Sequence, residues 1–292
     1  MELLDTLYNL MSLVFVLGTM ISMGLSLTLK QITAPLRNAR FMVVALLANF
    51  VLVPTAAYVL ALLIPLDETL VTGLILVSIA AGAPALPKLA QIAGVDAAAA
   101  TGLMVLLIVA TILIMPIGLP LLLSGVEVGF WDIASGLLTL MLIPLALSLF
   151  VRARWEPIAA IVQPYAAQAS SISLLFLLVL MVVLNWSSVV SLFGSGGLLA
   201  SILLVAIAVV IGYLLGGPGA STKWVQALGA GQRNIAAAMV VATANFGSEE
   251  IVMIVVYSLI TLVLMTPLAG ELGKRAKAAA AEGEDLAVSA SG

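Results

Sequence analysis

Long apolar runs recur along the whole chain and constrain its fold more than any other feature. The run from Leu103 to Met115, for example, contains no charged residue. Such runs lie in segments long enough to cross a hydrocarbon core about 30 Å thick. The strands of membrane barrels instead alternate apolar and polar residues over short distances. The sequence therefore predicts an all-α polytopic membrane protein.

The composition supports this class and excludes several others. Of the 292 residues, 63% are hydrophobic and only 9% are charged, which is too few charges to cover the surface of a soluble domain. The chain has no cysteine and no histidine, so disulfides, thiolate or histidine metal sites and histidine catalysis are excluded. Motifs of serine hydrolases, zinc proteases and P-loop enzymes are absent. We expect no enzyme activity, no cofactor, no metal and no nucleic-acid partner.

Charged or Gly/Pro-rich positions divide the chain into nine apolar segments, whose orientation follows from the basic residues. The segments are 8–29, 41–64, 68–93, 96–124, 129–152, 157–184, 195–216, 222–246 and 250–272. With the N-terminus outside, the loops on the cytoplasmic side hold Lys30, Arg37, Arg40, Arg152, Arg154, Lys223, Lys274, Arg275 and Lys277. The opposite loops hold Asp67, Glu68, Glu127, Asp132, Glu249 and Glu250. The positive-inside rule therefore predicts nine spans with a cytoplasmic C-terminus, and we expect them in a bacterial inner (plasma) membrane.

Two basic residues, Lys88 and Arg233, remain inside apolar segments. A charge within a membrane span costs roughly 2.5–3.5 kcal/mol on insertion scales and usually marks a polar pathway. Since no carboxylate lies at a matching depth, a bound anion, water or deprotonation of Lys88 is expected to relieve the charge. Two simpler readings stay open. Lys88 could reach the cytoplasmic interface along its own stem, and Arg233 could bond to loose backbone carbonyls.

Both cations lie in interrupted segments, GAPALPKLAQ (82–91) and GAGQRN (229–234). The residues expected to break these helices or allow close approach are Gly82, Pro84, Pro87, Gly229 and Gly231. Pairing the first four segments with the last four places one interruption opposite the other, in halves of opposite orientation. Such inverted repeats with two broken helices point to a transporter site near the bilayer midplane. Gln91 and Gln232 would either line that site or satisfy local backbone.

Four stretches in order resemble the bile acid:sodium symporter family: SMGLSLTLK (22–30), ANFVLVPTAAYVL (48–60), GAPALPKLAQIAGVD (82–96) and GAGQRNIAAAMVVATANF (229–246). The resemblance implies a panel domain (1–40 and 125–194) and a core transport domain (41–124 and 195–275) in which the two broken helices cross. Family members mostly move organic anions with sodium by alternating access. Residues 276–292 are expected to form a disordered cytoplasmic tail, with a short helical extension as the alternative.

The sodium ligands that the resemblance implies are mostly replaced in this chain. Leu86 and Pro87 stand where the family has a Ser-Asn pair, and Ala100 and Met104 stand where hydroxyls are expected. Gly229 replaces a glutamate and Arg233 a glutamine, which leaves the amide of Asn49, with Asn234 as a further candidate. The fixed charges of Lys88 and Arg233 are therefore expected to replace sodium. The predicted substrate and ion site comprises Lys88, Arg233, Asn49, Gln91, Gln232 and Asn234.

The predicted function is secondary transport of small organic anions by alternating access, independent of sodium. Transport would be facilitated, of the exchange type, or linked to protons through Lys88. The alternatives are a sodium-coupled organic anion symporter, an anion channel and a non-transporting sensor. The expected partners are the anion and the lipid bilayer, and the sequence does not define an oligomeric state.

Overall fold

The computed structural model describes residues 2–28, 30–31, 38–123, 129–184, 186–187, 190 and 194–291; Arg37 and Glu127, used above to orient the chain, lie outside them. Within the described residues all regular structure is helical, which confirms the predicted class. Seven helical stretches there are long and apolar enough to cross a membrane. They are α1 (Glu2–Ser26), the stretch of α3 (Ala39–Leu47), η2 (Ala48–Leu52) and α4 (Val53–Leu63), α7 (Ala97–Leu122), the stretch of α8 (Phe130–Leu137), η3 (Leu138–Leu142) and α9 (Ile143–Arg154), α10 (Glu156–Leu184), α12 (Gly197–Leu215) and α15 (Ser248–Ser291).

The two interrupted segments each consist of two shorter helices. Segment 68–93 holds α5 (Glu68–Ile79) and α6 (Leu86–Ile92), and segment 222–246 holds α13 (Ala220–Gly231) and α14 (Ile235–Asn245). The described chain thus has seven long helices where the sequence predicted nine spans. The difference arises at the two interruptions, where no continuous helix is long enough to cross.

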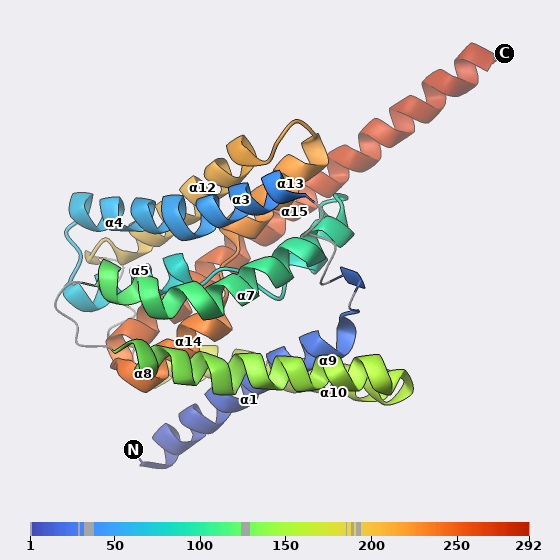
Figure 1. Cartoon of the computed structure of the whole chain (residues 1–292). Helices are drawn as coiled ribbons and strands as arrows, with labels where there is room; N and C mark the ends of the chain where they lie inside the picture. Colours follow the sequence, from blue (N-terminus) through green and yellow to red (C-terminus); the bar gives the residue numbers. More distant parts are fainter. Residues whose placement is uncertain are drawn as a thin grey trace.

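The helices form two groups (Figure 1). Helix α1 packs on α9 and α10 on one side of the molecule, and α3, α4, α12 and α13 lie on the opposite side. Small residues bring α1 close to its neighbours, because a Cβ on Gly24 would lie 2.0 Å from the Ser148 side-chain oxygen. Close backbone approach at small residues is a common mode of helix packing in membranes.

The first interruption is held by helix α7. The Thr111 hydroxyl accepts from the Ala81 amide at 3.0 Å and donates to the Ala81 carbonyl at 2.9 Å. Gly82 adopts a φ of 83°, and a Cβ there would lie 2.5 Å from the backbone nitrogen of Ile108. Only glycine therefore fits this position. Pro87 falls in the first turn of α6, where its missing amide hydrogen leaves no helical bond unmade.

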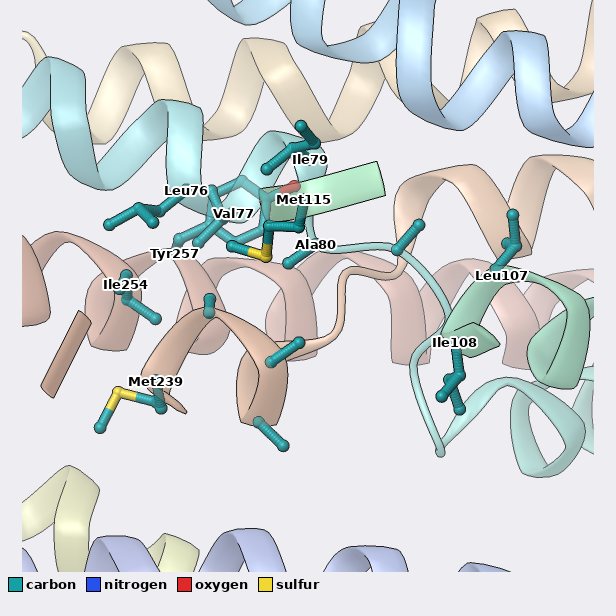
Figure 2. Close-up of a cluster of buried hydrophobic side chains, with 14 of the residues drawn as sticks. Leu76, Val77, Ile79, Ala80, Leu107, Ile108, Met115, Met239, Ile254 and Tyr257 are labelled. Carbon is teal, nitrogen blue, oxygen red and sulfur yellow. The ribbon is translucent and has the colours of Figure 1, made fainter. Parts of the chain in front are cut away.

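The second interruption is short and contacts the first. Asn234 caps α14 by accepting from the Ala237 amide at 3.1 Å. Its own backbone amide donates to the Ala80 carbonyl at 2.8 Å, so the two linkers are hydrogen-bonded to each other. Buried side chains of α5, α7, α14 and α15, including Met115, surround this region (Figure 2).

Helix α15 continues beyond the bundle to Ser291 (Figure 1). The sequence predicted a disordered tail from residue 276, with a short helical extension as the alternative, and α15 here includes residues 276–291. At the same end of the core, Asp96 caps α7 by accepting from the amides of Ala98 and Ala99, both at 2.9 Å.

Candidate ion and substrate site

Arg233 lies in the linker between α13 and α14 and is only 1% exposed. Its Nε donates to the Val77 carbonyl at 3.1 Å, and its Nη1 donates to Asn49 Oδ1 at 2.7 Å and to the Ala230 carbonyl at 3.2 Å. Its Nη2 donates to the Asn49 carbonyl at 3.3 Å and to the Ser78 carbonyl. The guanidinium is thus enclosed by five oxygen acceptors, which we call the oxygen cage.

The helix ends explain why these carbonyls are free. Val77 and Ser78 lie in the last turn of α5, and Ala230 lies in the last turn of α13. Carbonyls in the last turn of a helix have no partner within the helix, and the C-terminus carries about half a negative charge. Two helix ends therefore compensate the guanidinium, and both ion pairs found among the described residues lie elsewhere.

The Asn49 carbonyl is free for a different reason. In the π-helical turn η2, the amide of Val53 donates to Ala48 instead of Asn49. The next residue, Pro54, has no amide hydrogen, so the helix supplies no donor to the Asn49 carbonyl. π-helical turns of this kind are frequent at functional sites. Proline and the π turn together therefore free the fifth oxygen of the cage.

The oxygen cage has the chemistry of a site for a hard cation. Carbonyl and amide oxygens are typical ligands of such ions, and here they surround an arginine guanidinium. Among the described residues, no group of three or more acidic, histidine or cysteine side chains could hold a metal. The Arg233 charge is balanced by protein oxygens, which corresponds to the structural alternative raised from the sequence, whereas a bound anion or water was the leading expectation.

A cavity of about 780 Å³ lies between α1 and α10 on one side and α6, α7 and the second linker on the other, and it opens to solvent. On the side of α6 and the second linker, its lining includes Pro84, Pro87, Lys88, Gln91, Gln232 and Arg233. The structure therefore brings four of the six predicted site residues to one cavity. The other two, Asn49 and Asn234, are fully buried and do not line it.

Lys88 is the cation that the cavity leaves available. It lies on α6 with an exposed side chain, and it has no hydrogen-bond or ion-pair partner within the described ranges. Gln91 follows three residues later, on the same face of the helix. The side-chain oxygen of Gln232 is buried and has no hydrogen-bond partner in the described part of the chain. An anion in this cavity would meet one free ammonium and nearby amide groups.

The opposite wall carries polar residues that the sequence analysis missed. Helix α1 contributes Thr19, Ser22 and Ser26, and α10 contributes Gln163, Ser170 and Ser171. Gln163 donates to the Ser22 hydroxyl at 3.1 Å, and the hydroxyls of Thr19 and Ser170 lie 2.6 Å apart. The spacing was a usable signal, because intervals of three, four, seven and eight residues place polar groups on one helical face.

Several positions at which the family resemblance implies sodium ligands are closely packed. A Cβ on Gly229 would lie 2.6 Å from Leu103 Cδ2. Leu86 and Ala100 are fully buried and apolar. Pro87 and Met104 instead line the large cavity, and none of these five residues supplies a side-chain oxygen.

A cavity beside two interrupted membrane helices, with polar side chains on both of its walls, is typical of a membrane transport protein. The model of the Sodium Bile acid symporter family matches residues 13–192, more than half of the chain, and the chain belongs to this family. Its members are transporters and not enzymes, which suggests a small-molecule substrate. The matched region ends before α12, so Arg233 lies outside it. No curated protein matches the chain.

Proposed function

We propose that this integral membrane protein is a secondary transporter of small organic anions that works by alternating access without sodium. The observation that carries the proposal is the oxygen cage around Arg233. Arginine keeps its charge at any physiological pH, so the cage holds a permanent cation. The Arg233 guanidinium would thereby supply the positive charge that a sodium ion supplies in the family.

A sodium ion could not share this position. Two unit charges 4 Å apart repel by about 4 kcal/mol at an effective dielectric constant of 20. All five acceptors of the cage already bond to the guanidinium. A fixed cation of this kind can support anion binding nearby, but it cannot carry the energy of a sodium gradient. Transport would be facilitated, of the exchange type, or linked to protons through Lys88.

Lys88 is the proposed contact for the substrate anion. Its ammonium faces the cavity, and Gln91 and Gln232 offer neighbouring amide groups. Arg233 would act mainly by shaping the linkers, because its bonds to Asn49 and to the helix ends leave it no free donor. The two cations thus take different roles, one binding the substrate and one replacing an ion.

We further propose the membrane arrangement predicted from the sequence, with nine crossings, inverted repeats, an outside N-terminus and a cytoplasmic C-terminus. The panel domain (1–40 and 125–194) and the core domain (41–124 and 195–275) would move against each other. The location of the cavity between α1 and α10 on one side and α6 on the other supports this division. So does the bond between Asn234 and Ala80, which would let the linkers of the core move together.

Counterflow in proteoliposomes tests the proposal. Short carboxylates are first screened for thermal stabilisation of the wild type but not of Lys88→Gln. The best of them is then loaded inside the vesicles, with choline replacing sodium. A carrier is expected to exchange the unlabelled carboxylate inside for labelled carboxylate added outside, with an uptake rate that saturates as the outside concentration rises. Family membership favours a sodium-coupled symporter as second candidate, and uptake that appears only on adding sodium would support that candidate instead.

A further inference from the structure

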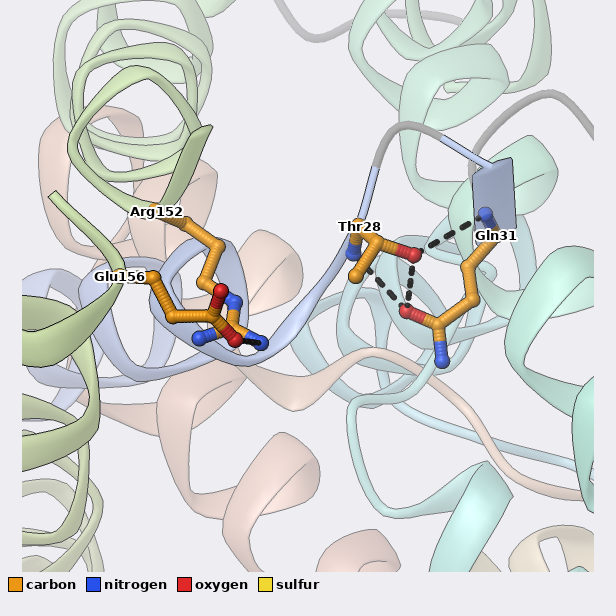
Figure 3. A network of polar contacts seen from close by, with 4 residues as sticks. All are labelled: Thr28, Gln31, Arg152 and Glu156. Atoms are coloured by element: carbon orange, nitrogen blue, oxygen red, sulfur yellow. Dashed lines mark hydrogen bonds and ion pairs between the residues drawn. The ribbon is translucent and has the colours of Figure 1, made fainter. Parts of the chain in front are cut away.

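A second cavity, of about 370 Å³, lies where the end of α1 meets the junction of α9 and α10. It is lined by Leu27, Thr28, Lys30, Leu149, Arg152, Ala153 and Glu156. Figure 3 shows Thr28 with its partner Gln31, and Arg152 with Glu156. None of the proposed substrate contacts lines this cavity, which we call the basic pocket.

Arg152 has unused hydrogen-bonding capacity in the basic pocket. Its side chain is only 22% exposed, and its Nη2 lies 2.9 Å from Glu156 Oε1. A guanidinium has five N–H donors, and no other contact of Arg152 is found within the described residues. The Glu156 side chain is 72% exposed. With Lys30, two cations face one carboxylate, so the pocket carries a net positive charge.

Aromatic side chains place the pocket at the level of lipid headgroups. Phe150 and Trp155 are 59% and 47% exposed, and their rings pack edge to face with centroids 5.8 Å apart. Exposed tryptophan at the end of a membrane helix is typical of the interface between lipid and water. The pocket is lined by Leu149 and Glu156, the sequence neighbours of this pair, and by Leu27. A ligand there could place a charged group on Arg152 and an apolar chain on the leucines.

We propose that the basic pocket binds the phosphate group of an anionic phospholipid. The planar guanidinium matches phosphate oxygens with two parallel hydrogen bonds, and basic pockets between membrane helices are a known setting for such headgroups. The net positive charge selects an anionic lipid over a zwitterionic one. This proposal does not depend on the transport function.

Native mass spectrometry of the full-length protein in detergent tests it, with phosphatidylglycerol and phosphatidylcholine of identical acyl chains. Phosphatidylglycerol should bind the wild type more tightly than phosphatidylcholine does. Arg152→Gln should weaken phosphatidylglycerol binding about tenfold or more, because it removes the charged hydrogen bonds of the guanidinium. The matched control is Arg154→Gln, because Arg154 is exposed in the same helical turn outside the pocket and should change binding less than about twofold.

Glu156→Gln provides an independent arm with the opposite sign. Removing the carboxylate frees the whole guanidinium, so phosphatidylglycerol should bind about three times more tightly. If Arg152→Gln fails to fold, the binding of phosphatidylglycerol to Glu156→Gln tests the proposal by itself. Equal losses in the Arg152 and Arg154 variants, or no gain in the Glu156 variant, would overturn the proposal. So would complete displacement of the lipid by millimolar inorganic phosphate, which would identify a site for free anions.

Discussion

Arg233 donates to both oxygens of Asn49, at 2.7 Å to the side-chain Oδ1 and at 3.3 Å to the backbone carbonyl. The two residues are 184 positions apart in the chain. Their contact joins the π-helical turn before Pro54 to the linker between α13 and α14. The buried cation therefore holds together three parts of the core, since it also bonds to the end of α5.

Asn49→Leu should destabilise the protein by about 2 kcal/mol, because a buried guanidinium donor loses its acceptor. The expected result is a fall of several degrees in the Tm of the purified protein in detergent. Asn245→Leu is the matched control. Its amide donates only to Val241 of its own helix, so a much smaller shift is expected. Similar shifts in both variants would mean that the Arg233 contact contributes little.

Thr111→Val should lower stability by about 1–3 kcal/mol, because it removes the hydroxyl that serves both the amide and the carbonyl of Ala81. Thr111→Ser keeps the hydroxyl and should restore most of the loss. Thr261→Val is the control, because that hydroxyl bonds only to Tyr257 one turn earlier. Thermal unfolding of all three variants checks this, and an unrepaired loss in the serine variant would instead point to packing of the methyl group.

Gly229→Ala should cost about 1–3 kcal/mol, because the added methyl group would press on Leu103. Gly270→Ala is the control in a helix, since nothing lies within 4 Å of a Cβ there. That change should be neutral or stabilise by up to about 1 kcal/mol, from the higher helix propensity of alanine. A comparison of the two Tm values tests the packing around α13, and equal stability would contradict it.

Lys88→Gln should raise the KM for the carboxylate about tenfold or more, because the only unpaired ammonium facing the cavity within the described residues is lost. The Tm should stay unchanged, since Lys88 is exposed. Lys223→Gln is the control, because Lys223 lies over the ring of Tyr213 and not in the cavity. The KM of each variant is obtained from uptake rates at a series of carboxylate concentrations. An unaltered KM in the Lys88 variant would contradict the proposed anion contact.

Much of the fold followed from the sequence, because long apolar runs leave a chain few options. The hydrogen-bond acceptors of Arg233, by contrast, could not be predicted from the sequence. Arg233 stood out as a charge in an apolar segment, but its partners include the backbone carbonyls of Val77, Ser78 and Ala230. Which carbonyls are free depends on where helices end, and residue identity does not encode that directly.

The polar wall of the cavity was predictable in principle. Ser22 and Gln163 lie at helical spacing from other polar residues in apolar segments, and this pattern can be read without a structure. Their pairing across α1 and α10 could not be, because it depends on how the two helices cross. The residues after 275 misled for another reason. Their alanine-rich composition favours helix.

The dependence of transport on sodium tests the central claim most directly. Initial uptake of the selected carboxylate is measured in proteoliposomes while choline is exchanged for sodium at constant ionic strength. With Arg233 filling the oxygen cage, neither the KM nor the maximal rate should change across the titration. A steep fall in KM with rising sodium would show that a mobile ion binds after all, and would contradict the replacement of sodium by Arg233.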